Sequence, residues 1–557
     1  MYPRQPFSRR RALQMAAVTG AGLAATAVAG PAVAKEPAPR RAPAAAPSVF
    51  LHGVASGDPL PEAVVLWTRV TPTAAATPGS GVGPEVAVEW EIAADDDFDR
   101  IVLHGEARTG PERDHTVKVD ARGLDPATTY WYRFRAQGTT SPAGRTRTAP
   151  AEDADVPRLR MAVVSCANMQ AGWFTAYRHL AERRDLDLVV HLGDYFYEYG
   201  PGQVSDLIVR PHDPPWETVT LADYRRRHAQ YKADRDLQAL HAVAPWVITW
   251  DDHESANDAW AGGATNHTPG AEGDWPVRRA AAQQAYAEWM PVRFGPDGEI
   301  YRRLRFGTLA SLSMLDLRTY RSEQPATLLD PAIDDPARTM TGPEQEDFLL
   351  DGLLDESVQW KLVGNPVMIA PIAFPGLLDI HAKRAIATLI HTPRPGSDMP
   401  YNVDTWDGYG AERARLLGQL RDHGVTGAVF LTGDIHSGWA ADLPADTAAY
   451  PTTGESVGVE LVCTSLTSDN IDDILGSRPR TRSLSVERAI QRNNPHVKYL
   501  DLDSHGFSVL DVTPERVQMD WYVLIDRLDP QSAAVWSTSW RVPAGSTSVE
   551  RASGRLP

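Results

Sequence analysis

Several short apolar stretches of this sequence each end in an acid, a histidine or a cysteine. They are VVSC, VVHLGD, VITWDDHE and VFLTGDIH, which end at Cys166, at Asp194, within residues 251–254 and within residues 434–436. Strands of α/β proteins place functional groups at their carboxyl ends. One such ending is unremarkable, but four together are hard to explain by packing, because an unpaired buried carboxylate is costly. The pattern predicts an α/β sheet with a chemical site at one edge.

Two regions of different character follow each other along the chain. Residues 48–150 alternate between apolar and polar positions and are broken by polar turns, as in an immunoglobulin- or fibronectin-like β-sandwich. From about residue 158, apolar strands alternate with polar helical stretches, which is typical of a layered α/β domain. A chain of 557 residues is too long for one ordinary core. We therefore predict an all-β domain over 48–150, an α/β domain over 158–540 and a C-terminal tail over 541–557.

The N-terminal segment has the composition of an export signal. Residues 1–34 have a basic head, an Ala/Gly-rich apolar stretch and AVA before Lys35. The sequence SRRRAL (8–13) resembles a twin-arginine signal, with an ordinary export signal as the alternative. Residues 35–47 are rich in Pro and Ala and predict a spacer, and no later apolar run is long enough to span a bilayer. We expect export by twin-arginine machinery and a secreted or cell-wall-associated protein.

The net charge limits the possible partners. It is −17 at pH 7, and the first 34 residues contribute arginines but no acid, so the chain without them is more acidic still. Such a protein repels nucleic acid and anionic membranes at long range. We expect no stable nucleic-acid complex, and the composition is compatible with a monomer. An anionic substrate would need local positive charge, which metal ions supply.

The donors at the strand ends indicate a metal centre. Asp194 is a hard oxygen donor that can bridge two cations, and Tyr197 follows three residues later. A phenol with a pKa near 10 is a poor ligand for Zn²⁺ or Mg²⁺, whereas a trivalent ion can hold it as phenolate, so Tyr197 indicates Fe³⁺. A Cys166 thiolate does not suit a site made only of Ca²⁺ or Mg²⁺. Oxygen donors suited to Ca²⁺ are Asp252, Asn257 and Asp434.

Each candidate residue also has a purely structural interpretation. Tyr197 alone fits an interfacial aromatic with its hydroxyl in water, and Cys166 alone fits a small buried apolar residue. His253 could be a structural histidine bonded to Asp252. Arg318 fits a phosphate clamp or a strand-end ion pair equally well. Cys463, in ELVCTSLTS, is expected in the core.

The motifs resemble a known enzyme family. Gly193-Asp194-x-x-Tyr197 with the later Gly433-Asp434-x-His436 resembles the calcineurin-like metallophosphoesterases, above all the purple acid phosphatase variant. The fuller ordered pattern resembles the alkaline phosphatase D / phospholipase D (PhoD-like) family over nearly the whole chain after the signal. Its segments include HGVASGDPLPEAVVLWTRV (52–70), VVSCAN (163–168), HLGDYFYE (191–198), TWDDHE (249–254), LDLRTYR (315–321), TWDGYGAER (405–413), LTGDIHSGW (431–439) and NPHVKYLDLDSHGF (494–507).

The resemblance implies a layered metallophosphoesterase sandwich that binds one Fe³⁺ and one or more Ca²⁺. It implies that iron is held by Cys166, Asp194, Tyr197 and His436. Asp194 would bridge to calcium, with Asn257, Asp434 and Asp252 as further ligands. The expected reaction is hydrolysis of phosphate mono- and diesters, in which a metal-activated hydroxide or oxide attacks phosphorus in line.

Roles in catalysis beyond metal binding are expected for a few of these residues. The expected catalytic residues are His253, Asp194 and Asp252, with His253 assisting the leaving group. His253 and Arg318 are expected to contact the phosphate. The sequence contains no Gly-rich phosphate loop and no G-x-S-x-G elbow that would favour a covalent route.

Two alternatives stay open at the level of the sequence. One is a phospholipase D that uses the same site on phospholipid diesters, which should show exposed apolar loops near the site; PVMIAPIAFPGLLDIHAK (366–383) is a candidate, although it fits core equally well. The other is a non-catalytic exported binding protein with a vestigial metal site. A full set of donor residues argues against this second alternative.

Overall fold

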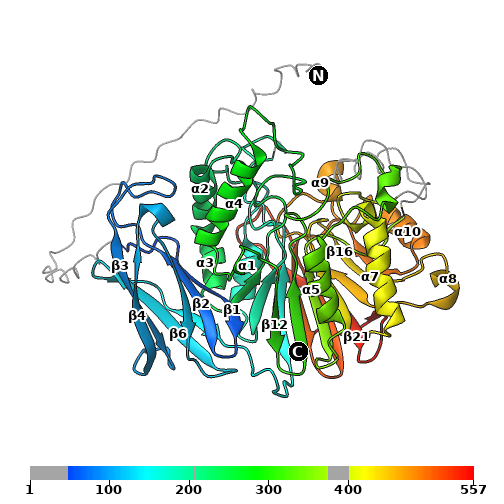
Figure 1. Ribbon diagram of the computed structural model, residues 1–557, viewed down its shortest axis with the longest axis horizontal. Helices are drawn as coiled ribbons and strands as arrows, with labels where there is room; N and C mark the ends of the chain where they lie inside the picture. The colour runs from blue at the N-terminus through cyan, green and yellow to red at the C-terminus, as the bar shows by residue number, and fades with distance from the viewer. Residues whose placement is uncertain (1–47, 205–206, 374–399) are drawn as a thin grey trace, which may run out of the picture. The chain divides into compact units, whose positions relative to one another are not determined.

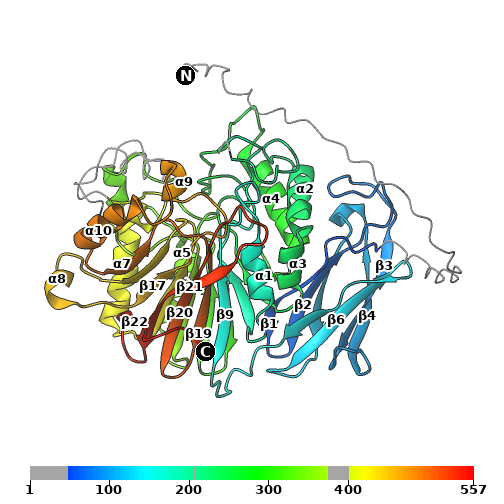
Figure 2. The same ribbon diagram turned by 180° about the vertical axis from the view of Figure 1, so that it is seen from behind.

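A computed structural model describes residues 48–204, 207–373 and 400–557. The predicted signal and spacer lie outside the described residues, as does most of segment 366–383. Residues 48–557 form one compact unit. Figures 1 and 2 show this unit from two opposite sides.

A ten-stranded sheet carries most of the predicted strand ends. In spatial order its strands are β22 (Glu550–Arg551), β21 (Ala534–Pro543), β20 (Arg516–Leu524), β19 (Gly506–Val512), β9 (Leu159–Val164), β10 (Leu188–His191), β11 (Trp246–Ile248), β1 (Val54–Leu60), β2 (Ala63–Arg69) and β5 (Thr116–Arg122). The central strands β9, β10 and β11 are parallel neighbours, with His191 opposite both Val164 and Ile248. Their carboxyl ends therefore meet at the same edge.

Two further sheets complete the β structure. A seven-stranded sheet has the order β12 (Arg302–Phe306), β13 (Ala310–Met314), β14 (Trp360–Asn365), β15 (Ala428–Thr432), β17 (Val459–Val462), β16 (Gly438–Asp442) and β18 (Val497–Asp501). A five-stranded sheet contains β4 (Ile101–Thr109), β3 (Val86–Ala93), β6 (Thr129–Ala136) and β7 (Thr139–Thr140), with β8 (Gly144–Arg147) paired to β6.

Helices cover the outer faces of the two large sheets. The α-helices are α1 (Thr175–Ala181), α2 (Leu221–Lys232), α3 (Arg235–His241), α4 (Trp275–Trp289), α5 (Pro343–Leu353), α7 (Gly410–Asp422), α8 (Tyr450–Thr453), α9 (Ile471–Leu475) and α10 (Ser483–Asn493); short 3-10 turns are η1 (Pro111–Arg113), η2 (Pro331–Asp334) and η3 (Trp406–Gly408). Apolar residues of α1–α4 pack on the ten-stranded sheet. Those of α5, α7 and α10 pack on the seven-stranded sheet, and α5 and α7 lie in front of it in Figure 1.

The two large sheets pack face to face, which gives the layered α/β sandwich expected from the sequence. Their shared core contains Met161, Val163 and Val190 from one sheet against Leu362 and Leu431 from the other, all at most 1% exposed. Burial of each such side chain stabilises the fold by about 1.5–3 kcal/mol. The sequence analysis placed all four strand ends on one sheet, and this was wrong: β9, β10 and β11 belong to one sheet and β15 to the other.

The N-terminal all-β region is present but shares strands with the rest of the unit. Strand β1 pairs in parallel with β11, and β2 and β5 extend the same sheet. Their inner faces pack against the five-stranded sheet, where Tyr130, Tyr132 and Phe134 of β6 are buried as the alternation predicts. Residues 541–557, predicted as a tail, contribute the end of β21 and the edge strand β22.

Candidate metal centre

The candidate ligands lie just beyond the carboxyl ends of four strands. Cys166 follows β9, Asp194 follows β10, Asp252 follows β11 and Asp434 follows β15. Because the two sheets pack face to face, these ends converge from two layers. The cavity between them is lined by Asp194, Asp252, His253, Asn257, Asp258, Asn402, Asp404, Asp434, Ile435 and His436.

The backbone at five of these positions is left-handed. The residues are Cys166, Asp194, Asp258, Asp434 and His436, with φ of 59°, 55°, 54°, 60° and 54°. Non-glycine residues rarely adopt this region, and such backbone strain clusters at functional sites. Gly193 has φ of 97°, and a Cβ there would lie 2.5 Å from the backbone nitrogen of Asp251. The turn after β10 therefore requires glycine at this position.

One group of donors has the mixed composition predicted for iron. Single ligand atoms of Cys166, Asp194 and His436 lie within 4.8 Å of one another. The Tyr197 hydroxyl donates to Asp194 Oδ2 at 2.9 Å and lies 3.1 Å from His436 Nε2. Asp194 Oδ1 is buried and has no hydrogen-bond partner. The structure thus brings together the sulfur, carboxylate, phenol and imidazole donors in one place.

The electrostatics of this group favour a bound cation. Burial, followed by the charge of Asp194, raises the pKa of the Cys166 thiol well above its usual value. Burial raises the pKa of Asp194 in the same way and lowers the pKa of His436 to about 3. In the absence of a bound metal ion, burial favours the neutral forms of these side chains. A cation among them reverses this preference, because it stabilises thiolate and carboxylate.

A second group of donors consists mainly of oxygen. Ligand atoms of Asp251, Asp252 and Asp434 lie within 4.8 Å of one another, and those of Asp252, Asp258 and Asp404 do so as well. Asp252 accepts the backbone N–H of Asp258 at 2.6 Å through Oδ2, while its Oδ1 is buried without a partner. Such oxygen-rich clusters are typical of Ca²⁺. Asp258 and Asp404 were not identified from the sequence, because they lie in loops and do not directly follow a strand.

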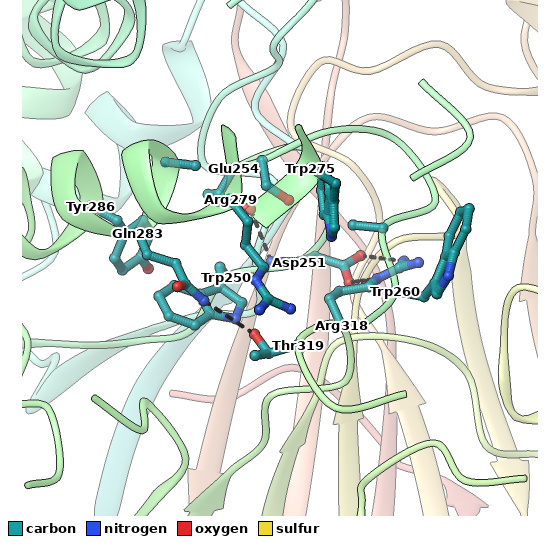
Figure 3. Close-up of a pocket in the computed structure, with 13 residues that line it drawn as sticks. Trp250, Asp251, Glu254, Trp260, Trp275, Arg279, Gln283, Tyr286, Arg318 and Thr319 are labelled. Carbon is teal, nitrogen blue, oxygen red and sulfur yellow. Dashed lines mark hydrogen bonds and ion pairs between the residues drawn. The ribbon is translucent and has the colours of Figure 1, made fainter. Parts of the chain in front are cut away.

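Arg318 lies inside this carboxylate cluster. Its guanidinium pairs with both oxygens of Asp251, and it donates to Asp404 at 2.7 Å and lies 3.5 Å from Asp434. Figure 3 shows the Asp251–Arg318 pair beside a cavity walled by aromatic side chains. Of the two interpretations of Arg318, the ion pair has observed contacts, and phosphate binding stays a prediction.

His253 is held by a residue that the sequence analysis did not single out. Glu198 is fully buried, and its Oε2 lies 2.7 Å from His253 Nδ1. Its Oε1 accepts from the backbone of Asn257 and from Asn266 Nδ2, both at 2.8 Å. Burial lowers the pKa of His253, but the carboxylates of Asp252, Glu198 and Asp194 outweigh it and raise that pKa well above 6.5. Glu198 therefore fixes the ring of His253 at the wall of the cavity.

Glu254 links the two strand ends that carry Asp194 and Asp252. Its carboxylate accepts three backbone N–H groups, from Asp194 at 3.1 Å, Tyr195 at 2.6 Å and Asp251 at 2.9 Å. Both Glu198 and Glu254 stand within motifs quoted above, HLGDYFYE and TWDDHE. The positions of Glu198 and Glu254 in the sequence do not predict these contacts, because the contacts depend on the conformation of the loops after β10 and β11.

The loop after β17 closes the other side of the donor group formed by Cys166, Asp194, Tyr197 and His436. Ser468 Oγ donates to the Tyr197 hydroxyl at 2.7 Å, and the Asp469 carbonyl lies 2.9 Å from His436 Nδ1. Arg527 pairs with Asp469 at 2.7 Å and with Asp473 at 2.9 Å. The chain beyond residue 525 thus supports this loop through Arg527.

Segment 366–383 shows no exposed apolar surface in its described part. Val367, Met368, Ile369 and Ile372 are at most 3% exposed and belong to the core under α5 and α7. Residues 374–383 lie outside the described part. Cys463 is fully buried and is a free cysteine, as is Cys166.

Comparison with known proteins identifies the family of this chain. The family model described as PhoD-like phosphatase matches residues 161–521, and the model of the PhoD-like phosphatase N-terminal domain matches residues 34–150. The chain belongs to the PhoD-like phosphatase family. It is 37% identical to alkaline phosphatase D of Bacillus subtilis (strain 168) over 516 residues, which cover 90% of this chain and 82% of that protein.

Solved structures show the same fold. The structure of PhoD superimposes with a TM-score of 0.81 at 35% identity, covering 92% of this chain and 94% of that one. Purple acid phosphatase PPD1 from yellow lupin (Lupinus luteus) seeds superimposes with a TM-score of 0.50 at 11% identity, over 88% of this chain and 73% of that one, and this likeness concerns the fold alone.

Membership in the PhoD-like family makes the chain a phosphoester hydrolase that depends on metal. This conclusion rules against the non-catalytic binding protein considered above. Within the described residues, no helix is both long and apolar enough to cross a bilayer.

Proposed function

We propose that this PhoD-like phosphatase is an exported phosphoesterase that uses one Fe³⁺ and one or more Ca²⁺ to hydrolyse phosphate mono- and diesters. The observation that carries the proposal is the contact of the Tyr197 hydroxyl with Asp194 and His436 beside Cys166. A phenol and a thiol in one donor set suit a trivalent iron and do not suit Ca²⁺ or Mg²⁺. Export rests on the twin-arginine-like sequence of residues 8–13.

The donors present fit two kinds of ion. Cys166, Asp194, Tyr197 and His436 would hold iron. Asp194 and Asp252, each with one unpartnered carboxylate oxygen, would hold calcium together with Asn257 and Asp434, which line the same cavity. When bound, these ions supply the positive charge that offsets phosphate and lower the pKa of water so that it can act as a nucleophile.

The chain's own residues orient the ligands and the substrate. The Asp469 carbonyl holds His436 through Nδ1, so that Nε2 faces Tyr197 and the donor group. Glu198 binds Nδ1 of His253. The Nε2–H of His253 is then left to donate to a phosphate oxygen or to the leaving-group oxygen. The cationic form of His253 supplies a proton to the departing alcohol.

The metal content and visible spectrum of the purified protein test this proposal. We expect iron and calcium, with a phenolate-to-iron absorption band that Tyr197→Phe abolishes. Zinc or magnesium alone, without colour, would show that Tyr197 and Cys166 are wrongly assigned. A second variant, Asp194→Asn, should lose metal and nearly all turnover while keeping its circular dichroism spectrum. Full activity in that variant would contradict the proposal.

A further inference from the structure

A groove opens from the metal centre on the side of Tyr197. It has a volume of about 440 Å³ and shares His253, Asn257 and His436 with the wall of the metal cavity. Its other described lining residues are Asn168, Gln170, Ala171, Tyr197, Tyr199, Gln203, Val204, Leu207, Ser468, Asp469 and Ile474. The groove and the metal cavity are therefore adjacent.

Apart from His253 and His436, which it shares with the metal cavity, the described lining is uncharged or ion-paired and partly apolar. Among the described lining residues there are amides, two tyrosines and four aliphatic side chains, but no lysine or arginine. The carboxylate of Asp469 is paired with Arg527 at 2.7 Å and carries no free charge into the groove. Away from the metal cavity, an additional phosphate in the groove would thus meet no lysine or arginine among the described lining residues, in a protein of net charge −17.

Gln170 contributes an unpaired hydrogen-bond acceptor to the groove lining. Its side chain is 8% exposed, and its Oε1 is buried without a hydrogen-bond partner. An unsatisfied acceptor at a groove wall gains from a ligand that donates a hydrogen bond, because leaving it unpaired is costly. Tyr199, whose ring meets His253 edge-on at 5.3 Å, and Ile474 provide apolar surface in the same groove.

We propose that this groove binds the organic substituent of the phosphate ester and selects neutral, hydroxyl-bearing, partly apolar substituents over anionic ones. The proposal rests on the phosphoesterase function above and extends it to the substrate class. A nucleoside or polyol ester with a single phosphate fits it, whereas a polyanionic chain such as a nucleic acid does not.

A matched pair of substrates tests the charge selection. p-Nitrophenyl thymidine 5′-phosphate and its 3′-phosphorylated counterpart release the same p-nitrophenol from the same phosphodiester and differ only in one added phosphate. We expect kcat/KM to be at least about tenfold lower for the 3′-phosphorylated ester. Equal values for the two esters would overturn the proposal.

Two valine-to-lysine variants place the effect in the groove. Val204 lines the groove and is 61% exposed, while Val277 lies on α4, outside the groove lining, and is 69% exposed. Both substitutions add the same charge at an exposed position. Val204→Lys should raise kcat/KM for the 3′-phosphorylated ester about fivefold, and Val277→Lys should leave it unchanged. An equal rise in both variants would show a general charge effect and contradict the groove assignment.

An inhibition measurement separates the groove from the diesterase function. If bis(p-nitrophenyl) phosphate is not hydrolysed, the proposed action on diesters fails, and the groove is then tested on p-nitrophenyl phosphate. Thymidine 5′-phosphate should inhibit that reaction at least about tenfold better than thymidine 3′,5′-bisphosphate. Gln170→Leu should weaken inhibition by thymidine 5′-phosphate and leave inhibition by inorganic phosphate unchanged. Equal inhibition by both nucleotides would refute the proposal independently of the diesterase result.

Discussion

Replacement of His228 by phenylalanine tests the energetics of the interior behind the metal centre. His228 of α2 is fully buried, stacks in parallel on Trp289 and meets Phe196 edge-on at 4.7 Å. Neither of its ring nitrogens has a hydrogen-bond partner. An unpaired buried polar group costs about 1–3 kcal/mol. Because phenylalanine keeps a planar ring of similar size, we expect His228→Phe to raise the free energy of unfolding by about 1–2 kcal/mol at pH 7.5.

The pH dependence of this variant separates charge from packing. Burial, followed by the positive charge of Lys232, holds the pKa of His228 well below 6.5. The folded protein keeps the ring neutral, whereas the unfolded chain protonates it below pH 6.5. Stability from this group is therefore fully present above pH 6.5 and is lost as the pH falls. At pH 5.5 the parent protein loses about 1.4 kcal/mol through His228, and the phenylalanine variant does not.

Urea denaturation followed by tryptophan fluorescence measures both quantities. The stability difference between His228→Phe and the parent should be larger at pH 5.5 than at pH 7.5 by about 1.4 kcal/mol. A difference that does not change with pH would show that the ring carries a proton, or meets water, in the folded protein. A variant less stable than the parent at pH 7.5 would refute the argument from unpaired nitrogens.

Three further substitutions address the supports of the site and the core. Glu198→Gln keeps the shape of the side chain but removes the charge that holds His253, so kcat should fall about 10–100-fold at unchanged circular dichroism; an unchanged kcat would contradict this role. Gly193→Ala places a methyl group 2.5 Å from the backbone of Asp251, so the metal content after purification and Tm should both fall, and parent values of both would disprove the steric argument. Burial raises the pKa of Glu460 to about 7, so its contribution to stability is complete below pH 4.5 and is lost as the pH rises to 7. In urea titrations between pH 4.5 and 8, the free energy of unfolding of the parent should fall by about 3 kcal/mol through Glu460. Glu460→Gln should not show this fall, and parallel pH profiles for variant and parent would count against the argument.

The residues directly after strands were accessible from the sequence. Apolar runs of four to eight residues predict β9, β10, β11 and β15, and the polar residue after each run is placed at the strand end by chain continuity alone. Cys166, Asp194 and Asp434 could be found in this way. The contact of Tyr197 with Asp194 also follows from the short spacing between them.

Sheet membership and loop contacts could not be obtained from the sequence. Periodicity identifies a strand but not its neighbours, so the separation of β11 and β15 into two sheets depends on the packing of the shared core to which Val247 and Val429 belong. Asp404 reaches the cluster from a loop between β14 and α7, and its pairing with Arg318 is a tertiary contact. Glu254 acts on backbone N–H groups, which carry no signature in the amino-acid sequence.

The order of strands in the ten-stranded sheet has a consequence for when the protein can assemble. The ligand-bearing strand β9 lies between β10 and β19, and β19 comes more than 300 residues after β9 in the chain. During synthesis, β9 therefore remains an open edge until residues 506–512 have left the ribosome. His436 and Arg527 also appear late. The centre can form only after these late segments have been made, since pairing of distant segments is slow and must precede it. Assembly of the metal site is thus one of the last steps in the folding of this chain.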